Sequence, residues 1–486
     1  MEQEDALYAA FKAKDSRFDG RFFVGISSTG VYCRPVCWAK IAKRSNCAFF
    51  SSAAEAEQAG YRPCLLCRPE LAPGNALVDA TSTLARKAAR LLEENCGNGQ
   101  KLEELAARLD CTGRHLRRVF WEEYHVTPVQ YLQTCRLLLA KNLLTDTELS
   151  VLEVAMAAGF GSLRRMNDLF QKQYKLSPSA LRKQVSKGMR DTGVITVTLG
   201  YRPPYCWEEM LLFLADRAIT GVEKVENGQY YRTVRLIGRT GETYTGWIRV
   251  NRHPKKNALS ITMNDTLIPV LSQVLSRVRH LFDLYCDPDA VYEILQSMNE
   301  LLPGMCVKGR RIPGCFEPFE TAVRAVLGQQ ISVKAASTLA GRMAQDLGVA
   351  VETGIEGLNH IFPTVEAIIA LGGCAQERLE RLGITAARSA CIRTLAEAMS
   401  RGEIQIEQSA APEQEIKKLQ SLKGIGSWTA QYIAMRTMGW TDAFLETDTG
   451  VKHALPGYSS KELLALAERW KPWRSYAVMN LWCKEK

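Results

Sequence analysis

The spacing of hydrophobic residues divides the chain into four stretches. Short apolar runs broken by cysteines extend to about residue 76, and apolar residues at helical spacing follow. The chain then changes to alternating β-branched and polar residues, before helical spacing returns and continues to the end. This pattern predicts a multidomain protein that is mainly α with α+β parts. The expected domains span residues 1–76, 81–188, 192–300 and 301–486.

The second stretch contains an internal repeat. The apolar pattern of residues 105–128 returns about fifty residues later, in residues 154–178. Each copy predicts a helix, a short turn and a second helix, and the turn of the second copy is Gly159-Phe160-Gly161. We expect two tandem helix-turn-helix units, although an arbitrary helical hairpin would show the same periodicity.

The third stretch is rich in strand-forming residues. Residues 194–199, 230–236 and 244–250 alternate as strands do. Gly238 and Gly241 lie between the last two segments and predict a turn. We therefore expect an antiparallel sheet with helices packed on it.

Charge singles out the helical repeat. The chain has 486 residues and a formal net charge of +10, and residues 81–190 alone hold 18 Lys/Arg against 11 Asp/Glu. This segment is the candidate contact for a polyanion. The N-terminus has no signal-peptide pattern and no apolar run of about 18 residues occurs, so we expect a cytoplasmic protein that does not span a membrane.

Four cysteines form two close pairs, Cys33 with Cys37 and Cys64 with Cys67. Two pairs separated by a loop suit a tetrahedral Cys₄ site, which predicts one zinc ion per chain. Most such sites only hold a small domain together. On spacing alone, a purely structural site is the favoured interpretation.

The segments around these cysteines resemble the methylphosphotriester-repair domain of the Ada family. The resemblance covers about residues 5–75 and is carried by Gly-Val-Tyr-Cys-Arg-Pro-Val-Cys at 30–37 and Ala-Gly-Tyr-Arg-Pro-Cys-Leu-Leu-Cys-Arg-Pro at 59–69. It implies that Cys33 irreversibly accepts a methyl group from a DNA phosphotriester, while the other three cysteines are co-ligands. Zinc keeps the thiols deprotonated at neutral pH, so Cys33 is a nucleophile without a general base.

Two consequences for DNA binding follow from this resemblance. Arg34, Lys43 and Arg44 are candidate contacts for the flanking phosphates, with solvated surface charges as the alternative interpretation. Methylation of Cys33 lowers the negative charge of the zinc-thiolate cluster, so we expect it to strengthen DNA binding by the helical repeat.

The helical repeat resembles the AraC/XylS-type DNA-binding module. The resemblance spans residues 84–184 and includes the similar tails at residues 124–128 and 174–178. It implies a regulator that binds promoter DNA, with RNA polymerase as the candidate protein partner. The second helix of each unit is expected in the major groove. The candidate DNA contacts are Arg114, His115, Arg117 and Arg118 in the first unit, and Ser162, Arg164, Arg165 and Asn167 in the second.

The last stretch contains a tight glycine turn, Leu-Lys-Gly-Ile-Gly-Ser-Trp-Thr-Ala at residues 422–430. The amides of Gly424 and Gly426 can point at a DNA phosphate, and the following helix N-terminus adds a favourable dipole. With Phe-Leu-Glu-Thr-Asp at residues 444–448, the turn resembles the helix-hairpin-helix glycosylases of AlkA type. Asp448 matches their catalytic carboxylate.

The resemblance to AlkA-type enzymes runs from about residue 194 to the end and implies further site residues. Segments 310–316, 319–333 and 472–477 support it. It places four residues around a flipped, alkylated base: Gln329, Trp428, Tyr432 and Trp482. A cationic base stacks well on such aromatic rings.

One position indicates the expected subtype, and three others depart from the family. Glycosylases that also cut the strand carry a Schiff-base lysine where this chain has Trp428, so we expect a monofunctional enzyme. The chain departs from the family at Gln330, where an apolar DNA wedge is expected, and at Glu446-Thr447, which replaces Pro-Asp. The substrate preference is therefore left open.

The three motif sets converge on alkylated DNA. They predict a type II DNA-3-methyladenine glycosylase, acting on 3-methyladenine and 7-methylguanine, joined to a methyl acceptor and a transcriptional regulator that works as a monomer at the nucleoid. Its partner is double-stranded DNA, both alkylated DNA and promoter sites. The alternative is a DNA-binding regulator whose glycosylase-like half is inactive. The presence of Asp448 favours the enzyme.

Overall fold

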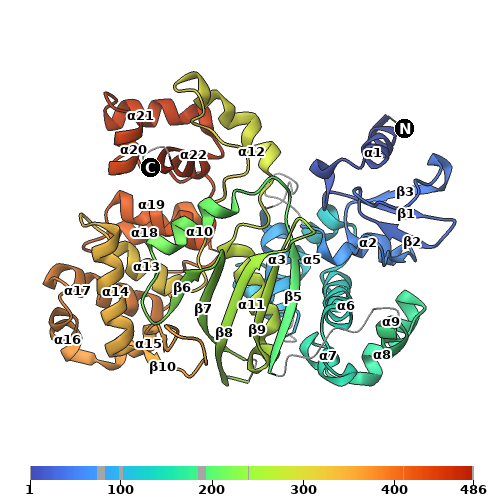
Figure 1. Cartoon of the computed structure of the whole chain (residues 1–486), viewed down its shortest axis with the longest axis horizontal. Helices are drawn as coiled ribbons and strands as arrows, with labels where there is room; N and C mark the ends of the chain where they lie inside the picture. Colours follow the sequence, from blue (N-terminus) through green and yellow to red (C-terminus); the bar gives the residue numbers. More distant parts are fainter. Residues whose placement is uncertain are drawn as a thin grey trace.

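The computed structural model describes residues 2–73, 83–97, 102–183, 193–238, 240–408 and 410–483. Figure 1 shows the chain from the blue N-terminal elements at the right to the red C-terminal helices at the upper left. The predicted fold class is confirmed, since a small cysteine-rich unit, tandem helix-turn-helix units, an antiparallel sheet and a helical region follow one another. Within the described ranges, no helix is both long and apolar enough to cross a membrane.

The cysteine-rich unit is built on a four-stranded sheet of order β3-β1-β2-β4. Strand β4 pairs in parallel with β2, with Tyr32 opposite Pro63. Cys33 ends β2 and Cys64 directly follows β4, so this pairing brings the two cysteine pairs together. The elements are α1 (Glu2–Ala13), β1 (Phe23–Ile26), β2 (Val31–Cys33), β3 (Cys47–Phe50), α2 (Ala53–Gln58) and β4 (Arg62–Pro63).

The helical repeat forms two units joined by a long helix. The helices are α3 (Thr83–Glu94), α4 (Leu102–Arg108), α5 (Gly113–Tyr124), α6 (Pro128–Asp146), α7 (Val151–Ala157), α8 (Leu163–Tyr174) and α9 (Pro178–Lys183). The hydroxyls of Thr112 and Ser162 cap α5 and α8 in the same way. The two predicted helix-turn-helix units, α4–α5 and α7–α8, are confirmed, because caps and apolar spacing agree in both copies.

A five-stranded antiparallel sheet of order β5-β9-β8-β7-β6 follows. Its strands are β5 (Val194–Gly200), β6 (Glu223–Glu226), β7 (Gln229–Ile237), β8 (Thr243–Arg252) and β9 (Ala258–Asn264). The three predicted strands correspond to β5, β7 and β8. Helices α10 (Trp207–Asp216), α11 (Leu271–Leu281) and α12 (Pro288–Leu295) accompany the sheet.

The remaining helices complete two hydrophobic cores. They are α13 (Pro318–Leu327), α14 (Val333–Leu347), α15 (Val365–Ala370), α16 (Ala375–Arg381), α17 (Ala386–Ser400), α18 (Pro412–Ser421), α19 (Ser427–Ile433), α20 (Thr449–Ala454), α21 (Ser460–Ala467) and α22 (Arg474–Trp482), with the short strands β10 (Val349–Ala350) and β11 (His360–Ile361). One core joins the sheet to α20–α22 and to α6–α9, and the other lies among α13–α19. Tyr432 and Trp440 pack against both cores. The predicted domain boundaries stay predictions.

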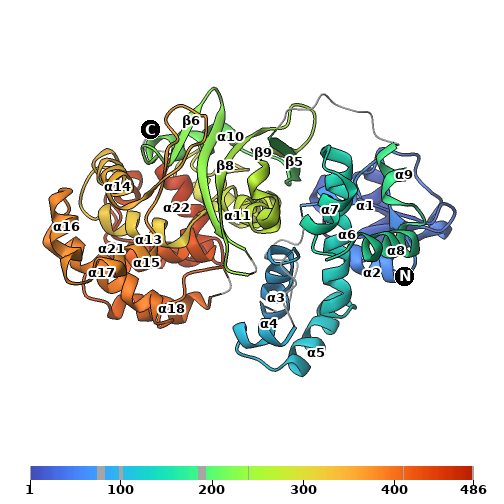
Figure 2. The ribbon, with the colours of Figure 1, turned by 90° about the horizontal axis from the view of Figure 1, so that it is seen from below.

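The helical repeat packs directly on the sheet and its helices (Figure 2). Helix α3 lies against α11, and the Tyr285 hydroxyl donates to the Glu93 carboxylate at 2.8 Å. At the sheet edge, Asn142 of α6 donates to the Thr198 carbonyl of β5 at 3.4 Å. Gly200 approaches the Leu71 carbonyl so closely that a Cβ there would lie 1.9 Å from its oxygen. The edge strand β5 is therefore covered.

Candidate zinc centre, DNA reader and glycosylase cleft

The four predicted zinc ligands lie together. The sulfur atoms of Cys33, Cys37, Cys64 and Cys67 are all within 4.8 Å of one another, and all four residues are buried. A tetrahedral Zn²⁺ with Zn–S bonds of about 2.3 Å separates its ligands by roughly 3.8 Å, so these residues fit one zinc ion per chain.

The four neighbouring thiols shift one another's pKa values in opposite directions, and a bound cation would favour the thiolate form of all four. Hydrogen bonds from Cys33 and then Cys37 lower the pKa of Cys64, whereas hydrogen bonds with Cys37, Cys64 and Cys67 raise the pKa of Cys33. A divalent ion binds all four as thiolates and removes these opposing shifts. The chemistry of the donor set therefore agrees with its geometry.

The three basic residues predicted to contact phosphates have different surroundings. Arg34 is nearly buried, forms an ion pair with Asp19 and donates to the Cys67 carbonyl at 3.2 Å. Arg44 forms ion pairs with both Glu4 and Asp5 on α1. Lys43 is exposed. Among the described ion pairs, Arg34 and Arg44 each have a partner that phosphate binding would displace, whereas Lys43 has none. The phosphate contacts of all three stay predictions.

The candidate DNA contacts of the helical repeat all lie on exposed positions of α5 and α8 or at the cap of α8. Three of the arginines form exposed ion pairs: Arg117 with Glu103, Arg118 with Glu122 and Arg164 with Asp168. Exposed pairs of this kind contribute less than about 1 kcal/mol, so they can exchange for phosphates. Each second helix therefore presents an accessible basic face, and the individual contacts stay predictions.

Asp448 lies at the start of α20 and is held by three N–H groups. The indoles of Trp428 and Trp482 donate to its two carboxylate oxygens at 2.8 and 2.7 Å. The carboxylate also caps α20, because the Val451 amide donates to it at 3.1 Å. Asp448 therefore caps α20 while its carboxylate also accepts from the two indoles, and its catalytic role stays a prediction.

The predicted aromatic residues surround this carboxylate. Trp428 and Tyr432 stack with ring centroids 5.1 Å apart, and Trp482 is 6.3 Å from Tyr432. The structure therefore brings together Trp428, Tyr432, Trp482 and Asp448. Gln329 instead donates to the Gly424 carbonyl and the Thr429 hydroxyl, at 2.9 and 3.0 Å, and so braces the glycine hairpin.

Sequence analysis missed three side chains beside Tyr432. Phe213 of α10 stacks on Trp482, and the Arg217 guanidinium lies 3.8 Å from the Phe213 ring centroid. Arg436, in a π-helix at Ala434–Met438, hydrogen-bonds to the Tyr432 hydroxyl. Burial alone would raise the pKa of Tyr432, but the nearby arginines, Arg436 first, lower it. A lone arginine in the apolar run Ile433–Met438 was the available signal.

The glycine hairpin has the conformation that its sequence requires. Gly424 has φ +95°, which favours glycine, whereas Gly426 precedes α19 with φ −86°. Both residues are exposed, so their backbone is accessible to DNA. Gln330 is also exposed and has a left-handed conformation, φ +54°, at the loop before α14. Their contacts with DNA stay predictions.

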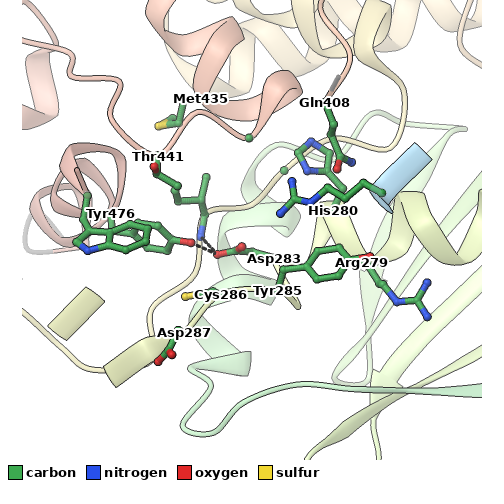
Figure 3. A pocket seen from close by; sticks show the side chains of 15 residues that line it. Arg279, His280, Asp283, Tyr285, Cys286, Asp287, Gln408, Met435, Thr441 and Tyr476 are labelled. Carbon is green, nitrogen blue, oxygen red and sulfur yellow. Dashed lines mark hydrogen bonds between the residues drawn. The ribbon is translucent and has the colours of Figure 1, made fainter. Parts of the chain in front are cut away.

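A separate cavity lies between α3 and the glycosylase-like half. It has a volume of about 40 Å³, too small for a nucleobase. Figure 3 shows Asp283 at its wall, receiving hydrogen bonds from the Tyr476 hydroxyl and from the Ile312 amide. Burial raises the pKa of Asp283 to about 6. None of the four predicted base-pocket residues lines this cavity.

Three family models match the chain. Residues 6–70 match the metal binding domain of Ada, residues 105–184 a helix-turn-helix domain, and residues 196–317 the AlkA N-terminal domain. All three resemblances expected from the sequence are confirmed.

The curated relatives include proteins that match single parts of the chain and one that matches nearly its whole length. The probable bifunctional transcriptional activator/DNA repair enzyme AlkA of Mycobacterium tuberculosis (strain H37Rv) is 33% identical over 98% of this chain and 96% of its own length. DNA-3-methyladenine glycosylase 2 of Escherichia coli is 36% identical over 59% of this chain and 97% of its own length. The bifunctional enzyme Ada of Escherichia coli is 35% identical over 32% of this chain and 43% of its own length. The chain therefore belongs to the family of bifunctional transcriptional activator/DNA repair AlkA proteins, which join Ada-type and helix-turn-helix domains to a DNA glycosylase.

Proposed function

We propose that the glycosylase half hydrolyses the N-glycosidic bond of alkylated purines such as 3-methyladenine and 7-methylguanine, with Asp448 as the catalytic carboxylate. The observation that carries this is the pair of indole N–H groups that fix both oxygens of Asp448 beside the aromatic cluster. An N-alkylated purine is cationic and leaves readily, and positive charge then develops on the sugar. A fixed carboxylate stabilises that charge in the transition state.

The proposed enzyme is monofunctional. Trp428 occupies the position expected for a Schiff-base lysine, and its indole is committed to Asp448. Water, oriented by Asp448, is therefore the nucleophile at the sugar carbon. The product is a free base and an intact abasic strand.

We further propose that the N-terminal unit repairs methyl phosphotriesters once per chain. Bound zinc supplies the thiolate form of Cys33. The Cys33 sulfur attacks the methyl carbon, a sulfur–carbon bond forms, and the carbon–oxygen bond to phosphate breaks. The electron pair leaves with the oxygen and restores the phosphodiester anion. Cys33 becomes a thioether with no hydrolytic route back.

Methylation is proposed to activate the DNA reader, α3–α9. Four thiolates around Zn²⁺ carry a net charge of about −2, and methylation reduces this to about −1. Phosphates near the cluster are then repelled less, and at low salt this is worth about tenfold or more in affinity. We propose that the activated chain binds promoter DNA as a monomer at the nucleoid, in the cytoplasm, and there contacts RNA polymerase.

Product analysis on a duplex with one 7-methylguanine tests the glycosylase proposal. We expect release of the base and an uncut abasic strand, which only later alkali treatment cleaves. Borohydride trapping of a covalent protein–DNA adduct would contradict the monofunctional mechanism. Absence of base release would favour a regulator with an inactive half.

A further inference from the structure

A buried carboxylate joins the zinc unit to the DNA reader. Glu57 of α2 is 3% exposed, and three hydroxyls donate to it: Thr134 at 2.8 Å, Tyr174 at 3.1 Å and Tyr32 at 3.2 Å. Among the described residues, no lysine, arginine or histidine forms an ion pair with Glu57. The side chain of Glu57 is therefore held by hydroxyl groups, and burying it in the charged form without a cation is costly.

The three hydroxyls come from three functionally different places. Tyr32 directly precedes Cys33 on β2. Thr134 lies on α6, the helix between the two reader units, and Tyr174 is the last residue of α8. The Gln173 side chain also donates to the Glu57 carbonyl. One carboxylate therefore connects the strand of the methyl acceptor with the second reader helix.

A second buried link starts at the other cysteine pair. Arg68, which follows Cys67, has a left-handed conformation with φ +52° and donates to Asp146 and Thr145 of α6 at 2.6 and 2.7 Å. Lys141 of α6 pairs with Glu70, and both side chains are at most 2% exposed. The loop of Cys67 is therefore fixed to α6, the helix whose Thr134 also donates to Glu57.

We propose that these two links, the Glu57 cage and the Arg68–Glu70 network, hold the zinc unit and the second reader unit as one rigid body, so that methylation of Cys33 acts on DNA bound by α8. The inference rests on the proposed methylation switch. A charge acts on phosphates only from within about one Debye length, roughly 8–10 Å in physiological salt. A cluster free to move relative to the reader would have no fixed distance from those phosphates, whereas the two links fix its position relative to α6 and α8.

The test removes contacts on the reader side only. Tyr174→Phe and Thr134→Val are combined in one variant, and Asp146→Asn is a second variant that loosens the Arg68 link. Tyr131→Phe is the matched control, since its buried hydroxyl donates at 2.7 Å to Glu93 within the reader. Full-length zinc-loaded proteins are titrated, before and after methylation, with a duplex that methylated wild-type protein selects from a random library. Mass spectrometry measures methyl transfer to Cys33, and circular dichroism measures folding.

We expect a gain of about tenfold or more on methylation for the wild type and for Tyr131→Phe. In the two link variants the gain should fall below about threefold, while methyl transfer is unchanged. Folded variants that accept the methyl group and keep the full gain would overturn the inference and leave the switch intact. A wild type that accepts the methyl group without any gain would overturn both, and one that accepts no methyl group would refute the proposed acceptor chemistry itself.

Discussion

Asp448 is the residue on which the proposed chemistry depends. Asp448→Asn keeps the size of the side chain but loses its charge. The new amide nitrogen cannot accept a hydrogen bond, so one of the two indole N–H groups would lose its acceptor. We expect base release to fall at least about 100-fold, since the transition state loses a preorganised charge, while affinity for abasic DNA persists. Single-turnover kinetics on methylated duplex measure this. Glu446→Gln removes a neighbouring carboxylate as a control, and an equal loss there would refute the specific role of Asp448.

Glu57 should make stability depend on pH. Burial raises its pKa to about 7, more than hydrogen bonds from Thr134, Tyr174 and Tyr32 lower it. Because the folded pKa is raised, its contribution is most favourable below the usual pKa of 4.5 and is lost as pH rises to about 7. The Glu57→Gln variant has no titrating group at this position, so its free energy of unfolding does not fall in this pH range. We expect the free energy of unfolding of the variant to exceed that of the wild type by a difference that grows between pH 5 and 7.5, up to about 3 kcal/mol. Denaturant titrations at several pH values check this, and parallel curves would argue against it.

Single residues could be predicted from sequence where a motif fixes their neighbours. The cysteine pairs follow from their spacing, and the aromatic residues around Asp448 were placed by the resemblance to AlkA-type enzymes. Glu57 and Phe213 could not be predicted, because their partners are far away in the sequence and only tertiary packing brings them together. Gln329 shows a further limit, since the resemblance placed it around the flipped base, whereas its side chain donates to the glycine hairpin.

The hairpin between α18 and α19 depends on one of its two glycines. Any residue at position 424 must adopt φ +95°, and a Cβ there would lie 3.1 Å from the Cβ of Cys391. A Cβ at position 426 would meet nothing within 4 Å. We expect Gly424→Ala to lower the free energy of unfolding by about 1–2 kcal/mol and to weaken DNA binding, because the amides shift. Gly426→Ala should stay within about 0.5 kcal/mol of wild type. Equal denaturation midpoints for the two variants would contradict this reading of the turn.

The reader helices should bind DNA through their exposed arginines. Arg165 lies on the exposed face of α8. If it contacts a phosphate, Arg165→Ala weakens binding to all duplexes and reduces the slope of log K against log salt by about 1. Arg401→Ala, an exposed arginine paired with Glu403 in the glycosylase half, serves as the control. An unchanged slope for Arg165→Ala would remove this residue from the interface.

At the level of elements, regular patterns predicted well and short ones did not. The reader helices and strands β5, β7 and β8 follow caps and periodicities that the sequence shows. Strand β6 was missed because Glu-Lys-Val-Glu has no strand character of its own and is paired by β7. The π-helix at Ala434–Met438 was also missed, since its packing against Phe213 and Tyr432 has no counterpart in local spacing.

At the level of the whole molecule, the docking of the parts could not be predicted. One hydrophobic core runs from α6–α9 through the sheet to α22, and Arg21 of the zinc unit pairs with Asp287 at the start of α12. These contacts join segments hundreds of residues apart, and no local pattern encodes them. Through these contacts the units pack into one molecule. The sequence showed only the order of the units along the chain.

We propose that one chain carries two alkylation-repair chemistries, one catalytic and one used once. DNA with radiolabelled methyl groups separates the two, because the label can be followed over time in free bases and on the protein. We predict that labelled bases continue to accumulate over many turnovers, while label on the protein stops at one methyl per chain, on Cys33. Base release that stops when the protein-bound label stops would refute turnover, and protein-bound label that persists in Cys33→Ala would refute Cys33 as the acceptor.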